Sequence, residues 1–176
     1  GIQKYEYAIG TTSGGTDLVS WADNSTTTSV TKTGLTLSNG TAYYISVRAT
    51  DNAGNVATVV TSDGVTIDTA APITGSVTDS TSTDMDWTRS TTTLTAAWSG
   101  FSDALSGIQK YEYAIGTTSG GTDVVTWADN STTTSVTKTA LTLTNGTTYY
   151  ISVKATDNVG NVSNIATADG ITVDTD

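Results

Sequence analysis

Carboxylates and hydroxyls are the reactive side chains of this sequence. Its 176 residues include no His and no Cys, which excludes a Ser–His–Asp triad, a cysteine nucleophile and a thiolate zinc site. Paired carboxylates would remain for glycoside cleavage, but Glu6 and Glu112 are the only glutamates. Each stands between tyrosines of an alternating run, so we expect both to face solvent. We therefore predict that the chain is not an enzyme.

The net charge of the chain limits the kinds of molecule that it is expected to bind. Seven Lys and Arg stand against 17 Asp and Glu, for a net charge of −10, which opposes binding to nucleic acid or to an anionic membrane surface. No apolar run approaches the ~20 residues of a membrane-spanning helix. We therefore expect no membrane insertion by this segment. The Gly-Gly pairs at 14–15 and 120–121 lack the Lys and the following helix of a phosphate loop and indicate turns.

An internal repeat organises the chain. Residues 1–70 align with 107–176 at a constant offset of 106, and 55 of the 70 pairs are identical. A unit of about 106 residues fits one small β-sandwich and is too long for a solenoid repeat. We predict a partial repeat over 1–70 and a complete one over 71–176. The partial repeat has no counterpart of 71–106.

Each unit has the pattern of an all-β domain. Short alternating runs are separated by clusters of Gly, Asn and Asp, and no stretch has a helical period. The strands expected in the second unit are Ile73–Val77, Thr91–Trp98, Ile108–Ile115, Val124–Trp127, Ser135–Leu143, Tyr149–Ala155 and Ile171–Val173.

The order of motifs resembles the fibronectin type III domain, as found in large bacterial surface proteins. Leu143 stands six residues before Tyr149, as Leu37 does before Tyr43, which matches the family's corner tyrosine. Trp98 matches the core tryptophan of the second strand. The resemblance implies tandem seven-stranded sandwiches, the first lacking strands A and B, with these five residues in the cores. An Asn-Gly before the corner and a long polar segment 78–90 leave a related immunoglobulin-like bacterial repeat open.

The resemblance also suggests one metal site. In this family the entry linker, the B–C loop and the F–G loop lie at one end, which brings Asp68, Asp103 and Asp157 to an interdomain junction. Ca²⁺ takes six to eight oxygen ligands, so calcium is the one cofactor we consider. The alternative is that these residues only make turns, since no stretch spells a D-x-D-x-D-G loop. No other cofactor is expected.

The absent strands allow two interpretations. Loss of one buried Trp costs about 3–5 kcal/mol, and a whole domain has only about 5–15 kcal/mol of stability. We expect the first unit to be part of a longer tandem array of which this chain is a window. The alternative is that a partner supplies the strands.

We expect a structural role, as a repeat of a secreted or surface-exposed bacterial stalk, adhesin shaft or filament. The expected partners are neighbouring repeats, or further copies in a fibre. Two alternatives are a carbohydrate- or protein-binding module, with Trp21 and Trp127 stacking on sugars, and an accessory spacer of a secreted hydrolase.

Overall fold

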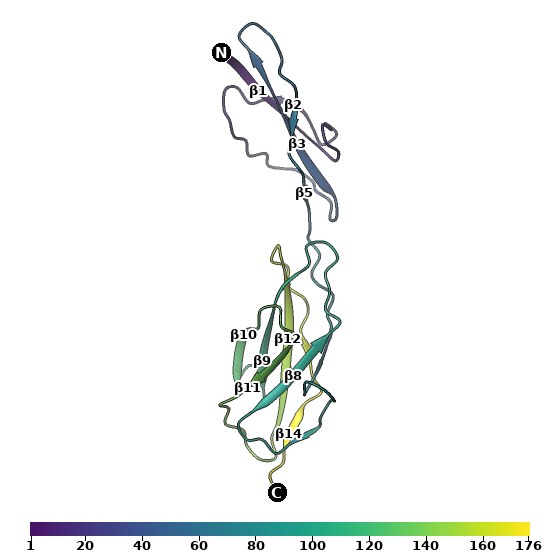
Figure 1. Cartoon of the computed structure of the whole chain (residues 1–176), viewed down its shortest axis with the longest axis vertical. Helices are drawn as coiled ribbons and strands as arrows, with labels where there is room; N and C mark the ends of the chain where they lie inside the picture. The colour runs from purple at the N-terminus through teal and green to yellow at the C-terminus, as the bar shows by residue number, and fades with distance from the viewer. The chain divides into compact units, whose positions relative to one another are not determined.

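The structure is a computed structural model that describes residues 1–176. The chain divides into two compact units, Gly1–Thr69 and Ala70–Asp176, and each is described by itself. Both are built from strands, turns and coil (Figure 1). The structure has no helix with the length and apolar character needed to cross a membrane.

The second unit is a sandwich of two sheets. The smaller sheet has the order β11-β8-β6, and the larger has the order β10-β9-β12-β14-β7, with β13 also paired to β12. The strands of the smaller sheet are β6 (Ser76–Thr78), β8 (Leu94–Ser99) and β11 (Ser135–Lys138). The strands of the larger sheet are β7 (Trp87–Thr88), β9 (Ile108–Gly116), β10 (Val125–Asp129), β12 (Thr148–Asp157), β13 (Ala166–Thr167) and β14 (Ile171–Val173).

The core lies between these sheets. Alternate residues of β8, namely Leu94, Ala96 and Trp98, are 3%, 0% and 4% exposed, because successive side chains of a strand point to opposite faces. The Trp98 ring packs edge-on against the ring of Tyr111 from β9, with 5.8 Å between the ring centroids. The Phe101 ring packs edge-on against the same tyrosine, with a centroid distance of 5.6 Å. Aromatic packing therefore joins the two sheets.

The strand order confirms the predicted fold. Strands A, B and E are β6, β8 and β11, and strands C′, C, F and G are β10, β9, β12 and β14, which is the fibronectin type III arrangement. Two strands were not predicted: β7, inside the polar segment 78–90, pairs in parallel with β14, and β13 pairs with β12. The first strand starts at Ser76 rather than Ile73, because Ile73 is 66% exposed and makes only an isolated bridge to Ser102.

The first unit is a single sheet with the order β2-β1-β3-β4, and β5 also pairs with β3. Its strands are β1 (Ile2–Gly10), β2 (Val19–Asp23), β3 (Ala42–Asp51), β4 (Val60–Thr61) and β5 (Val65–Thr66). The pairing of β1 with β3 repeats that of β9 with β12 at the offset of 106 residues. The counterpart of β11, residues 29–32, forms no strand.

Equivalent residues of the two units differ in how deeply they are buried. Ile45 and Val47 of β3 are 42% and 39% exposed, whereas their counterparts Ile151 and Val153 are 1% and 0% exposed. Leu37, which we predicted to be a core residue, is 39% exposed, whereas its counterpart Leu143 is 6% exposed. The prediction for Leu37 was wrong because no second sheet faces it in the first unit. Tyr43 remains buried, at 7%.

Candidate functional site

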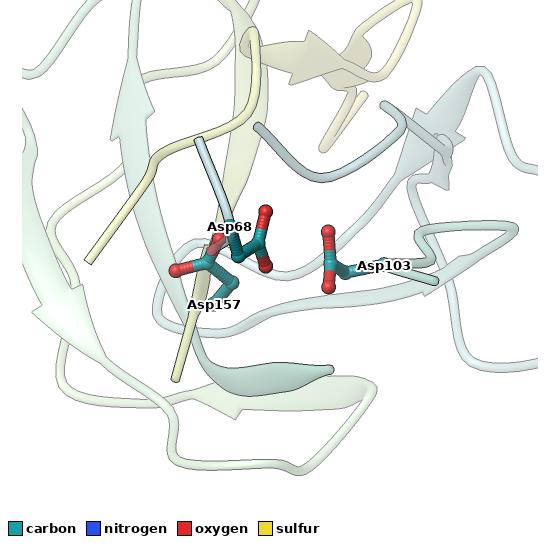
Figure 2. Close-up of side chains that lie close together, drawn as sticks. All are labelled: Asp68, Asp103 and Asp157. Atoms are coloured by element: carbon teal, nitrogen blue, oxygen red, sulfur yellow. The ribbon is translucent and has the colours of Figure 1, made fainter. Parts of the chain in front are cut away.

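Two of the three predicted calcium ligands belong to the second unit, where they close turns. Asp103 follows β8, and its Oδ1 accepts the backbone N–H groups of Leu105 and Gly107 at 3.1 and 2.7 Å. Asp157 ends β12, and its Oδ1 accepts the N–H of Asn161 at 2.8 Å. Carboxylate oxygens of Asp103 and Asp157 lie within 4.8 Å of each other (Figure 2).

Asp157 is fully buried. Burial by itself raises the pKa of its carboxyl, but hydrogen bonds from the side chain and backbone of Asn161 bring that pKa below its ordinary value. The turn thus favours a charged carboxylate. Asp68 lies in the first unit, after β5, so the calcium site of Asp68, Asp103 and Asp157 stays a prediction.

A second acidic cluster lies wholly in the second unit and was not predicted. Oxygens of Asp79, Asp84 and Asp169 lie within 4.8 Å of one another. Asp79 follows β6 and is 1% exposed, while Asp84 and Asp169 are exposed. Asp79 and Asp84 lie in the long polar segment 78–90, for which no site was predicted. The sequence feature that could have indicated the cluster is the close spacing of the aspartates Asp79, Asp84 and Asp86.

The two oxygens of Asp79 differ in their partners. Oδ2 accepts the N–H of Gly170 at 2.9 Å, whereas Oδ1 is buried and has no hydrogen-bond partner. The pKa of this carboxyl is raised to about 7, chiefly by burial and in part by the nearby charges of Asp169 and Asp84, against the lowering effect of the Gly170 hydrogen bond. The backbone N–H of Asp79 donates to Asp84 Oδ1 at 3.0 Å.

The two tryptophans proposed for sugar stacking have cations on their rings. The Arg48 guanidinium lies 4.3 Å from the ring centroid of Trp21, and Lys154 Nζ lies 4.5 Å from that of Trp127. Such contacts are attractive through the ring quadrupole. One face of each indole is therefore occupied within the chain, which does not favour the sugar-binding alternative.

The glutamates form ion pairs. Glu6 Oε2 accepts a hydrogen bond from Arg48 Nε at 3.0 Å, and Glu6 Oε1 lies 3.1 Å from Lys4 Nζ. The hydrogen bonds from Arg48 and Lys4 lower the pKa of the Glu6 carboxyl. Glu112 lies 3.5 and 3.7 Å from the Nζ atoms of Lys110 and Lys154. The prediction that both face solvent holds only in part, since their side chains are 13% and 20% exposed.

The strand order of the second unit defines a fibronectin type III-like sandwich architecture. No protein-family model matches the sequence. The chain is similar to Exoglucanase B of Cellulomonas fimi, with 37% identity over 159 residues. That match covers 86% of this chain and 13% of the exoglucanase.

A solved structure is also similar. The FN1–FN3 domains of chicken CNTN1 match with a TM-score of 0.47 and 16% identity, over 97% of this chain and 54% of that chain.

Proposed function

We propose that the chain is a spacer of a secreted multidomain protein that holds its other domains apart. The supporting observation is that the polypeptide chain enters the second unit at one end of the sandwich and leaves it at the opposite end. At the entry, the Ile73 N–H donates to the Ser102 carbonyl at 2.7 Å, and the Thr74 hydroxyl to the Asn164 carbonyl at 3.5 Å. Asn164 belongs to the loop after β12.

The exit lies at the other end of β12. The Val173 N–H donates to the Thr147 carbonyl at 3.1 Å, just before β12 starts at Thr148. At ~3.3 Å per residue, a strand of the length of β12 spans about 33 Å. The chain therefore advances by about one strand length in crossing the unit, as a spacer must.

The similarity to part of Exoglucanase B supports an accessory module of a secreted hydrolase. The chain matches 13% of that protein's length, so the bulk of the exoglucanase lies outside the match. On this proposal the chain is exported, and it positions a hydrolase domain without taking part in the reaction.

The near-identity of the units favours a second candidate function. With 55 of 70 pairs identical, and with the β1–β3 pairing repeating that of β9 with β12, the repeat suits the shaft of a surface stalk, adhesin or filament. Its partners would be neighbouring repeats or further copies in a fibre. The flanking sequence of the gene discriminates the two candidates: a hydrolase domain supports the accessory spacer, and a long series of repeats supports the shaft.

A distance measurement tests the spacing geometry. The chain has no native Cys, so spin labels attached to Ala71→Cys and Thr175→Cys report only the two ends of the second unit. We expect a narrow distribution centred near 30 Å, from the strand length, that is unchanged by cellulose. A distance below about half that value, or retention of the chain on cellulose, would contradict a purely spacing role.

A further inference from the structure

The cluster of Asp79, Asp84 and Asp169 carries more negative charge than its surroundings balance. Three carboxylates meet within 4.8 Å, and none of the ion pairs of the structure involves them. Like charges at this separation repel one another unless a proton or a cation lies between them. The cluster therefore needs a positive partner to be stable when fully ionised.

The buried oxygen of Asp79 indicates which partner fits. Asp79 Oδ1 has no donor although the residue is 1% exposed, and a buried polar atom without a partner costs free energy. Its other oxygen is held by Gly170 N–H at 2.9 Å, which fixes the carboxylate. Oδ1 is thus left as an acceptor without a donor.

The ligand types favour calcium. Ca²⁺ takes six to eight oxygens in flexible geometry, and carboxylates are its usual anionic ligands. One buried and two exposed carboxylates would supply the anionic ligands, and the exposed side leaves room for water. We propose that Asp79, Asp84 and Asp169 hold one Ca²⁺ ion in the second unit.

The position of the three residues gives the ion a structural role. Asp79 and Asp84 flank the turn that follows β6, and Asp169 lies in the turn between β13 and β14. A bound ion links the first strand of the smaller sheet to the last strand of the larger one. It therefore closes the sandwich along the edge where β7 pairs with β14.

The repeat provides an internal control. Asp63 of the first unit stands at the position of Asp169, but the first unit has no counterparts of Asp79 and Asp84. The chain should therefore bind one ion at this kind of site. The proposal does not depend on the spacer function, and it concerns a site distinct from that predicted at Asp68, Asp103 and Asp157.

The experiment uses the whole chain, freed of metal, at pH 7.5. Equilibrium dialysis against CaCl₂ measures stoichiometry, and thermal unfolding followed by tryptophan fluorescence measures stabilisation. NaCl of equal ionic strength controls for screening of the net charge of −10. We expect the cluster of Asp79, Asp84 and Asp169 to bind one ion with a dissociation constant of about 0.1–1 mM, the range of extracellular calcium modules, and a higher Tm in CaCl₂ than in NaCl.

Variants locate the ion. Asp79→Asn and Asp169→Asn should each weaken binding at least tenfold and remove the calcium-dependent rise in Tm, while Asp63→Asn should retain both. Tm in chelator shows whether each variant is folded, and Asp79→Asn should equal or exceed the parent there because it removes a repelled charge. The proposal is overturned by equal Tm in CaCl₂ and NaCl. It is also overturned by calcium binding that survives Asp79→Asn and is lost in Asp103→Asn.

Discussion

The backbone N–H of Thr144 donates to the phenol oxygen of Tyr149 at 2.9 Å. Ser38 and Tyr43 make the same bond at 3.0 Å in the first unit. The tyrosine thus fixes the corner before strand F in both units, although only the second has two sheets. The corner is set locally, by residues five apart in sequence.

Removal of this hydroxyl should destabilise the second unit. Tyr149→Phe leaves the Thr144 N–H without its acceptor, and loss of such a bond costs about 1–2 kcal/mol. Urea unfolding followed by tryptophan fluorescence would measure the loss. Tyr43→Phe is the matched control and should leave the transition of the second unit unchanged. A Tyr149→Phe variant as stable as the parent would show that the bond is not needed.

Matched leucines test the difference in burial. Leu143→Ala should cost the second unit about 2–5 kcal/mol, because it empties a buried site. Leu37→Ala should cost the first unit far less, since Leu37 is 39% exposed whereas Leu143 is 6% exposed. Hydrogen exchange resolved by residue reports each unit separately. Equal losses would mean that a second layer covers Leu37 in solution.

Alanine substitutions at two glycines distinguish the cost of backbone strain from the cost of side-chain crowding. Gly120 has φ of 77° and nothing within 4 Å of an added Cβ, so Gly120→Ala should cost about 1 kcal/mol. Gly170 has φ of 108°, and an added Cβ would lie 2.7 Å from the ring of Tyr150. Gly170→Ala should therefore cost on the order of 3 kcal/mol. Chemical denaturation of both variants provides the comparison, and similar costs would show that Tyr150 moves aside.

Acid should weaken the turn after β9. Asp123 accepts the Thr117 N–H at 3.0 Å and its hydroxyl at 2.9 Å, and these bonds lower the pKa of Asp123 below the ordinary value of 3.8. A carboxyl with a lowered pKa stabilises the fold above about pH 4, and that stability is lost as the pH falls through the folded-state pKa.

The test is unfolding by urea at pH 5, 4 and 3. The parent should lose stability on acidification more steeply than Asp123→Asn, which cannot titrate. Asp17→Asn changes the same turn of the first unit, where Thr11 donates at 3.0 Å, and should leave the second unit's pH dependence intact. Parallel pH profiles for the parent and Asp123→Asn would contradict the prediction.

Most of the fold followed from local patterns. Alternation in β8, β9 and β12 depends only on which face of each strand is buried, so it is visible in the sequence. The pairing of β7 with β14 was missed because two residues, Trp87 and Thr88, carry no periodicity. Their partners Thr172 and Val173 lie 85 positions further along the chain.

The sites were less predictable. Asp103 and Asp157 are predicted neighbours because the resemblance to a known fold placed their loops at one end. Asp79 looked like any polar loop residue, since its burial depends on the turn that carries Gly170. The exposure of Leu37 was missed because a core motif was carried over to a unit without the facing sheet. In each case the deciding contact is long-range.

The opposite positions of entry and exit in the second unit have a mechanical consequence. A force applied at Ile73 and Val173 runs nearly parallel to β12, so the bonds of the β7–β14 pair, which are parallel strands, are loaded in shear rather than opened one at a time. Bonds loaded together resist as a group. Under tension the unit should therefore yield abruptly at one threshold.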